Sequence, residues 1–260
     1  MMDDENMVGD DSNRSEDRDS RTLALIGEEA LSQLHAARVL VVGVGGVGGY
    51  AVEMLARTGV GHLTLIDADC VAPSNLNRQL IALESTIGQP KTGLFASRIL
   101  DINPDIEVDA RPEFLQACAV ATLLDEGYDF VLDCIDTVAP KVALIAECLR
   151  RNIPLISSMG AGGRTDVSKV TYSDLWETRE DGLARAVRQR LKKMGLRRRL
   201  TVVCSTEAPR PSSLLSDERK NKRSSYGTTA CVPATFGIFM ASHALNRLTS
   251  RPMQTETNHD

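Results

Sequence analysis

Short apolar or alternating runs alternate with longer amphipathic segments between residues 39 and 157. The short runs, which are typical of strands, are 39–42, 62–67, 106–110, 130–133 and 154–157. Between them, apolar residues recur at helical spacing over 47–58, 90–102, 115–125 and 138–151. Strands that alternate with helices of this length predict an α/β protein with a doubly wound, mostly parallel sheet.

The pattern becomes less regular on both sides of this block. An amphipathic helix is predicted over 21–38, strands over 167–172 and 200–203, a basic helix over 179–199, a mobile loop over 208–230 and an apolar helix over 232–248. We therefore divide the chain into a tail (1–17), a nucleotide-type domain (18–165), an irregular substrate-binding region (166–250) and a polar tail (251–260).

Charge is distributed unevenly along the 260 residues, although the overall net charge is only −5. Residues 1–20 carry eight acidic and two basic residues and have no apolar periodicity, which predicts a disordered acidic tail. Residues 151–223 carry seventeen Lys or Arg against eight Asp or Glu, so this region could hold a polyanion. Nothing in the pattern indicates readout of a DNA sequence.

The six cysteines are scattered and form no Cys-x-x-Cys pair, which argues against a zinc ribbon and against a secreted disulfide framework. No apolar run is long enough to span a membrane, and the polar, acidic start is unlike a signal peptide. A cytoplasmic protein that does not act at a membrane is the expectation.

A glycine-rich loop follows the first predicted strand. It contains Gly43, Gly45, Gly46 and Gly48, and Asp67 ends the second strand. Glycines let the backbone approach a phosphate, the following helix offers free N–H groups, and an acidic residue at this distance can accept a ribose hydroxyl. The pattern predicts a Rossmann-like nucleotide site; the alternative is a tight turn that binds nothing.

Further polar residues fall at the carboxyl ends of the strands. They form the segments Ser74-Asn75-Leu76-Asn77-Arg78-Gln79, Gly88-Gln89-Pro90-Lys91 and Asp133-Cys134-Ile135-Asp136. Together with the glycine loop, these segments resemble the ATP-dependent adenylating family that activates carboxylates. Its members include activators of ubiquitin-like proteins and enzymes of thiamin and molybdopterin synthesis.

The resemblance implies a role for each of these residues. Arg78 and Lys91 would hold the triphosphate of ATP, Asp67 the ribose, and Asp136 a Mg²⁺ ion, while Asn75, Asn77 and Gln79 would orient the phosphates or the loop. Arg18 would reach the ATP of a partner subunit in a homodimer. Arg18, Arg78, Lys91 and Asp136 would form the catalytic set. The sequence leaves open whether a monovalent cation, Na⁺ or K⁺, binds near 160–163.

Alternatives remain open for several of these residues. Arg78 and Lys91 could be solvated surface charges, Asp133 could cap its strand or the next helix, and Arg18 could belong to the disordered tail. Cys134 is expected in the core. Cys204 and Cys231 have no activating histidine beside them in the sequence, so neither is expected to be a catalytic thiol.

Motifs along nearly the whole chain are similar to one branch of that family, which dehydrates threonylcarbamoyladenosine at position 37 of tRNA. They are 26–31, 56–61, 140–145, 160–163, 205–207 and 234–237. The branch implies adenylation of the threonylcarbamoyl carboxylate followed by ring closure, and in some bacteria a cysteine-desulfurase-linked sulfur-acceptor partner. The candidate tRNA contacts are Arg185, Arg188, Arg190, Lys192, Lys193, Arg197, Arg198 and Arg199.

Two other functions are compatible with the same sheet. The chain could activate the C-terminus of a small ubiquitin-like or sulfur-carrier protein, perhaps through a cysteine thioester, although the zinc pairs common in such activators are missing. It could instead be a nucleotide sensor without transfer chemistry. The complete set of Asn77, Arg78, Gln79, Lys91 and Asp136 argues against a sensor, because a sensor does not need a transfer site.

Overall fold

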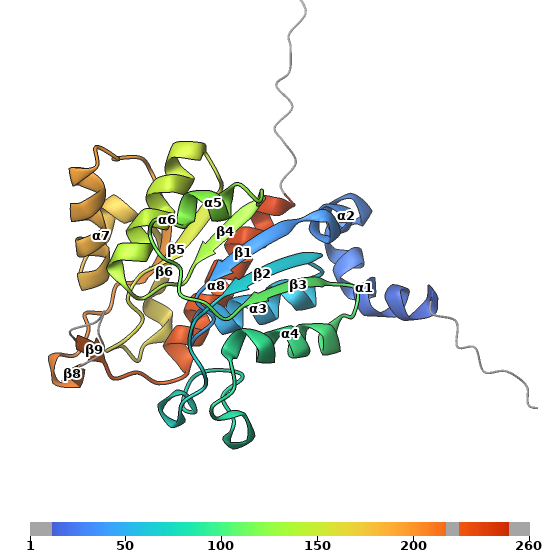
Figure 1. Ribbon diagram of the computed structural model, residues 1–260, viewed down its shortest axis with the longest axis horizontal. Helices are drawn as coiled ribbons and strands as arrows, with labels where there is room; N and C mark the ends of the chain where they lie inside the picture. The colour runs from blue at the N-terminus through green and yellow to red at the C-terminus, as the bar shows by residue number, and fades with distance from the viewer. Residues whose placement is uncertain (1–11, 217–223, 250–260) are drawn as a thin grey trace, which may run out of the picture.

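The computed structural model describes residues 12–216 and 224–249 and contains one seven-stranded sheet (Figure 1). Its strands are β1 Arg38–Val42, β2 His62–Ile66, β3 Glu107–Arg111, β4 Phe130–Asp133, β5 Leu155–Ser158, β6 Val170–Asp174 and β7 Thr201–Ser205. The order across the sheet is β3-β2-β1-β4-β5-β7-β6, and only β6 runs antiparallel to its neighbour. The predicted doubly wound, mostly parallel α/β fold is confirmed.

Helices cover both faces of this sheet (Figure 1). One layer is α3 Gly48–Thr58, α4 Lys91–Ile102 and α8 Cys231–Leu248; the other is α5 Val120–Leu124, α6 Val138–Arg151 and α7 Gly182–Lys193. Successive strand residues point to opposite faces, so Val41 and Leu65 pack in the core of the first layer while Leu40 and Ile66 pack in that of the second. Burial on both faces explains why the central strands are continuously apolar.

The N-terminal segment differs from the prediction of one helix over 21–38. It forms two helices, α1 Ser12–Ile26 and α2 Glu28–Ala36, because Gly27 breaks the segment with a φ of 83°. Helical structure also begins before residue 18, within the segment assigned to the acidic tail. A contact between Asp19 and His35 (3.1 Å) connects α1 to α2. Residues 1–11 lie outside the described part of the chain, as do residues 250–260.

The C-terminal half is continuous with the sheet, since β6 and β7 extend it beyond β5. Helix α7 is shorter than the predicted 179–199. The Asp181 carboxylate accepts a hydrogen bond from Ala184 N (2.8 Å) and begins the helix, and Gly195, with a φ of 71°, follows its end. Strands β8 Leu214–Ser216 and β9 Ser224–Tyr226 form a hairpin in the predicted loop.

Short 3₁₀ turns complete the described structure. They are Pro73–Asn75, Glu84–Thr86, Val167–Lys169, Leu175–Glu177 and Pro211–Ser213. In the described part of the chain, no helix combines the length and the apolar character that crossing a membrane requires.

Candidate active site

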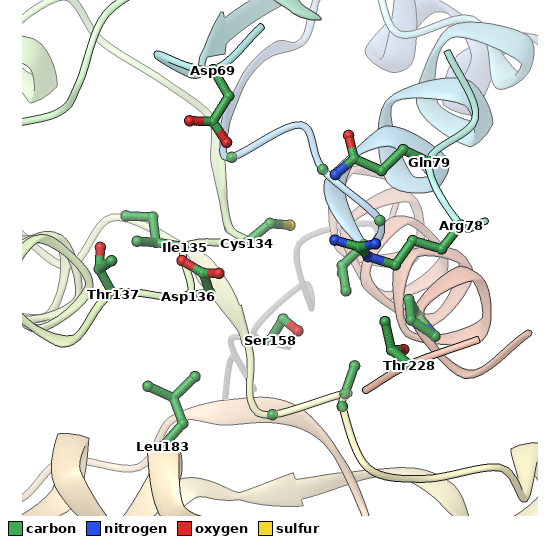
Figure 2. A pocket seen from close by; sticks show the side chains of 18 of the residues that line it. Asp69, Arg78, Gln79, Cys134, Ile135, Asp136, Thr137, Ser158, Leu183 and Thr228 are labelled. Atoms are coloured by element: carbon green, nitrogen blue, oxygen red, sulfur yellow. The ribbon is translucent and has the colours of Figure 1, made fainter. Parts of the chain in front are cut away.

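A cavity of about 1310 Å³ opens at the carboxyl ends of β1, β2, β4 and β5 (Figure 2). The strand order reverses between β1 and β4 at this edge, which is where open α/β sheets bind their ligands. Ten of the predicted site residues line the cavity, namely Gly43, Gly45, Gly46, Asp67, Asn75, Asn77, Arg78, Gln79, Lys91 and Asp136. Gly48 and Arg18 do not line it.

The glycine loop can only be built from glycines at its two ends. Gly43 has a φ of 88°, and a Cβ there would lie 2.8 Å from the carbonyl oxygen of Cys134. A Cβ at Gly48, the first residue of α3, would collide with the carbonyl of Gly43. Gly48 therefore supports the loop from outside the cavity, because it lets α3 begin directly behind β1.

Asp67 is held rigidly at the end of β2. Its carboxylate accepts hydrogen bonds from Val44 N (2.8 Å) and from Asp69 N (2.9 Å), so it also fixes the glycine loop. Burial raises the pKa of Asp67, and the charge of nearby Lys91 opposes that effect. A preorganised carboxylate in this place can accept a ribose hydroxyl.

Two basic side chains face the cavity from different elements. Lys91, at the first turn of α4, is only 3% exposed, and its Nζ lies 2.8 Å from Asp69 Oδ2. The interpretation of Lys91 as a solvated surface charge is therefore wrong. Arg78 donates to Ser74 O (2.7 Å) and to Asn77 Oδ1 (2.9 Å), and Figure 2 shows its guanidinium extending into the cavity toward Asp136. This geometry suits the oxygens of a phosphate chain.

The other polar residues of this segment differ in what they contact. Asn75 is buried and accepts from Ala72 N (3.1 Å), so it shapes the loop. The Nδ2 of Asn77 donates to Thr228 O (2.9 Å), which joins the loop to the C-terminal part of the chain. Gln79 is buried beside Gly45, and its Oε1 has no hydrogen-bond partner among the described residues. The side-chain amide of Gln79 therefore supports the glycine loop from behind.

Asp136 is placed by a charge pair beneath it. Asp133 and Lys141 are fully buried, 2.7 Å apart, and Ser157 Oγ donates to the same carboxylate oxygen (2.6 Å). The other oxygen of Asp133 accepts from Ile135 N (3.1 Å), so the network fixes the turn that carries Asp136. The prediction of a strand-end role for Asp133 is confirmed, and sequence reasoning missed Lys141 as its partner.

The donor set at Asp136 is compatible with Mg²⁺. In the described residues no three His, Cys, Asp or Glu side chains cluster as a metal cage. Mg²⁺ at nucleotide sites keeps several waters and takes one or two carboxylates together with phosphate oxygens, so it does not need such a cage. Asp136 is exposed to the cavity opposite Arg78 (Figure 2), where a carboxylate could meet a metal-bound phosphate.

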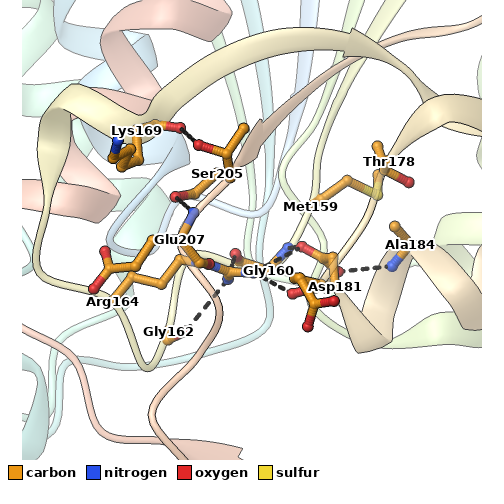
Figure 3. Close-up of polar contacts among 12 residues, drawn as sticks. Met159, Gly160, Gly162, Arg164, Lys169, Thr178, Asp181, Ala184, Ser205 and Glu207 are labelled. Carbon is orange, nitrogen blue, oxygen red and sulfur yellow. Dashed lines mark hydrogen bonds and ion pairs between the residues drawn. The ribbon is translucent and has the colours of Figure 1, made fainter.

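The far side of the cavity is built around Arg164 (Figure 3). Its buried guanidinium donates to the carbonyls of Gly160, Glu180 and Glu207, and Asp181 accepts from Gly160 N (2.9 Å). The carbonyls of the Gly160–Gly163 loop thus face a resident cation. The guanidinium of Arg164 holds carbonyls of the loop near which a monovalent cation was considered, and the binding of such a cation stays untested.

Arg18 lies away from the cavity. Its guanidinium bonds Asn103 Oδ1 (2.6 Å) and Asp105 Oδ2 (3.0 Å) of the same chain. Its predicted role at the ATP of a partner subunit stays a prediction.

Three cysteines bear on whether a thiol could take part in the chemistry. Cys204 is buried in β7, and Cys231, at the start of α8, is exposed. Cys134 contributes to the cavity wall, and burial raises its pKa far above the ordinary thiol value, which disfavours the reactive thiolate.

The sheet and its cavity define a nucleotide-binding α/β protein with paired basic and acidic groups for phosphate chemistry. The chain belongs to the ThiF family, whose model matches residues 17–259.

Individual relatives cover nearly the whole chain. The tRNA threonylcarbamoyladenosine dehydratase of Bacillus subtilis is 42% identical over 87% of this chain and 92% of its own length. The crystal structure of E. coli tRNA N6-threonylcarbamoyladenosine dehydratase, TcdA, in complex with ATP has a TM-score of 0.83 at 40% identity, covering 93% of this chain and 97% of that one. The molybdopterin-synthase adenylyltransferase of E. coli is also 40% identical, over 57% of this chain.

Proposed function

We propose that this protein dehydrates threonylcarbamoyladenosine at position 37 of tRNA, with ATP as the activating substrate. The observation that carries the proposal is one cavity in which Asp67, Arg78, Lys91 and Asp136 converge, in a chain that matches dehydratases over 87–93% of its length. The molybdopterin-type relatives share a shorter part of the chain, and burial raises the pKa of the Cys134 and Cys204 thiols, which disfavours a carrier thioester on either.

The chemistry balances with ATP as the sole co-reactant. A carboxylate oxygen of the threonylcarbamoyl group attacks the α-phosphorus, the bond to the β-phosphate bridging oxygen breaks, and pyrophosphate leaves. A nucleophile within the modified nucleoside then attacks the activated carbonyl carbon. AMP departs with the former carboxylate oxygen, and a ring closes with net loss of water.

Some residues of the cavity bind the substrates, and others also neutralise the negative charge of the reacting groups. Asp67 holds the ribose, while Lys91 and Arg78 hold the phosphates and offset the negative charge that accumulates as one anion attacks another. Asp136 would hold Mg²⁺, which supplies further neutralisation of the departing pyrophosphate when bound. Gln79, whose amide lies beside Gly45, orients the glycine loop.

Mass spectrometry of nucleosides tests the proposal directly. Purified protein, ATP, Mg²⁺ and threonylcarbamoylated tRNA should give a nucleoside lighter by one water (about 18 mass units), together with AMP and pyrophosphate. Arg78→Ala should lower turnover by about 10²- to 10³-fold, since it removes a preorganised charge from the transition state. Arg57→Ala, on the outer side of α3, is the matched control.

An unchanged nucleoside mass with retained ATP binding would overturn the dehydratase function. It would favour activation of a carrier-protein C-terminus, and a thiol-sensitive adduct that disappears in a Cys204→Ser, Cys231→Ser double variant would identify that chemistry. Normal cyclisation by Asp136→Ala would overturn the metal assignment. The proposed homodimer, with Arg18 serving the partner's ATP, is tested by sedimentation of the full chain and by mixing Arg18→Ala with Asp136→Ala subunits.

A further inference from the structure

The cavity is too large for a nucleotide alone. Its volume of about 1310 Å³ exceeds the roughly 300–1,000 Å³ typical of pockets for one small ligand. The residues of the nucleotide half come from β1, β2 and the loop before α4. A second half is lined by the 160–163 loop, the first turns of α7, the last residue of β9 and the segment after it, and its residues include Gly160, Gly162, Leu183, Ala186, Tyr226 and Thr228.

Tyr226 is the aromatic residue of this second half, because the other aromatic residue in the described lining, Phe114, follows β3 on the nucleotide side. Its side chain packs on the Gly162–Gly163 backbone. A Cβ at Gly162 would lie 2.9 Å from Tyr226 Cβ, and a Cβ at Gly163 would lie 3.0 Å from its Cδ1. The two glycines therefore make room for the ring, and Tyr226 stays 39% exposed in spite of its contact with them.

The segment that carries Tyr226 is anchored on three sides. Gly227 O accepts from Gly163 N (2.8 Å), and Gly227 N donates to Ser213 O (2.7 Å). Thr228 O accepts from Asn77 Nδ2 (2.9 Å), and Asn77 Oδ1 in turn accepts from Arg78 (2.9 Å). The backbone beside Tyr226 is thus fixed relative to Arg78, as the support of a rigid platform must be.

The surroundings indicate what this platform receives. Leu183 and Ala186 of helix α7 line the cavity. The same helix carries four exposed cations, Arg185, Arg190, Lys192 and Lys193. A polyanion that binds along α7 would therefore lie next to the opening of the second half of the cavity. A flat, partly exposed ring beside a cationic surface is how proteins take up unstacked RNA bases.

We propose that Tyr226 is a stacking platform for the target adenine base of the RNA, extruded from its loop into the second half of the cavity. This inference rests on the proposed function, because enzymes that act on a base must first take it out of its stack. With the base on Tyr226, its modified arm extends toward Arg78 and the phosphates.

Two variants separate stacking from other roles of the residue. Tyr226→Ala should raise the KM for threonylcarbamoylated tRNA by about 5- to 150-fold and leave the Kd for ATP unchanged. Tyr226→Phe keeps the ring and should retain the wild-type KM. Leu214→Ala, an exposed residue on the paired strand β8 that does not line the cavity, is the matched control.

A spectroscopic readout is independent of turnover. An anticodon stem-loop RNA with 2-aminopurine at the target position should lose fluorescence on binding to the wild-type protein and to Tyr226→Phe, but not to Tyr226→Ala. Equal quenching by all three proteins, or an unchanged KM in Tyr226→Ala, would overturn the platform. Quenching by a wild-type protein that fails to dehydrate tRNA would overturn the proposed function and support the platform as an RNA-base site.

Discussion

Asp133 and Lys141 show how single buried charges organise the site. Both are fully buried, and each is the other's ion-pair partner within a network that also includes Ser157 and Ile135 N. A buried pair of this kind adds little net stability compared with apolar residues, but loss of one partner leaves an uncompensated charge. Here the pair fixes the turn before Asp136, so its contribution is to position Asp136 rather than to stabilise the fold.

Lys141→Met is therefore expected to lower the free energy of unfolding by about 3–5 kcal/mol in urea denaturation, because it leaves Asp133 buried and unpaired. The double variant Asp133→Leu, Lys141→Met should recover most of that loss. Arg150→Ala, which removes an exposed ion pair on the same helix, should change stability by less than about 1 kcal/mol. Equal effects of Lys141→Met and Arg150→Ala would contradict the role assigned to the buried pair.

The raised pKa of Asp67 predicts that nucleoside binding depends on pH. Burial raises its pKa, so on acidification Asp67 takes up a proton at a higher pH than an ordinary aspartate. Only the ionised carboxylate accepts well from a ribose hydroxyl. Calorimetry with adenosine, which carries no phosphates, should show affinity that is full at neutral pH and falls as the pH drops through this raised pKa. Asp67→Asn should bind weakly and without that pH dependence; a wild-type affinity independent of pH would contradict the assignment.

Single residues also mark the limit of what the sequence predicts. Asp67, Arg78 and Lys91 were predictable because they follow strands whose ends must meet at one sheet edge. Lys141 was not, since a lysine in an amphipathic helix is ordinarily solvated and its sequence position does not reveal the aspartate eight residues earlier. Tyr226 was missed for a related reason: its neighbours at Gly162 and Gly163 are distant in the chain.

At the scale of elements, the crossing of α8 over α3 supports the glycine loop. Gly237 lies at this crossing, where a Cβ would collide with Val47 O and approach Tyr50 Cβ to 2.8 Å. Val47 immediately precedes α3, at the end of the glycine loop. The closing helix of the chain therefore reaches the nucleotide site through a contact that tolerates no side chain.

Gly237→Ala should destabilise the protein by about 1–3 kcal/mol and weaken ATP binding, because the forced separation of α8 from α3 displaces the loop. Gly93→Ala is a matched control within α4, since a Cβ there meets nothing within 4 Å. It should stabilise the protein by roughly 0.5–1 kcal/mol. Thermal unfolding and ATP titration of both variants provide the comparison, and similar behaviour of the two would refute the packing argument.

The ends of helices could be predicted where apolar periodicity is strong. The predictions were wrong where the conformation or hydrogen bonding of a single residue sets the end of a helix. The helix over 138–151 was predicted to the residue. The helix over 21–38 was not, because the left-handed conformation of Gly27 divides it. Likewise, hydrogen bonding by Asp181 shortens α7, and a side-chain cap of this kind competes with helical propensity in a way that periodicity does not reveal.

Across the whole molecule, the cations predicted to contact tRNA separate into two groups. Arg188 and Arg198 bond backbone carbonyls of the chain itself, at Leu175 and Leu149 respectively. The other six are exposed, namely Arg185, Arg190, Lys192, Lys193, Arg197 and Arg199, and Arg197 lies over the ring of Trp176. Arg188 and Arg198 are committed to carbonyls of the chain itself, so the basic surface that is available to phosphates is narrower than the count of Lys and Arg implies.

Replacement of Arg190, Lys193 and Arg197 by alanine should weaken tRNA binding uniformly. The slope of log affinity against log salt should fall by roughly 0.7–0.9 for each phosphate that the surface no longer neutralises, as filter binding over a salt series would measure. Arg57→Ala, on α3 in the opposite helix layer, should leave the slope unchanged. An unaltered slope in the triple variant would place the RNA elsewhere on the surface.

The double hydrogen bond of Asn77 has a thermodynamic consequence for how the two substrates meet. It connects Arg78, the proposed phosphate ligand, with the Thr228 segment, which lines the second half of the cavity. Linkage between two sites is reciprocal, so whatever factor ATP contributes to tRNA affinity, tRNA must contribute to ATP affinity. Each substrate therefore changes the affinity of the cavity for the other by the same factor, and the occupancy of the cavity depends on both concentrations together.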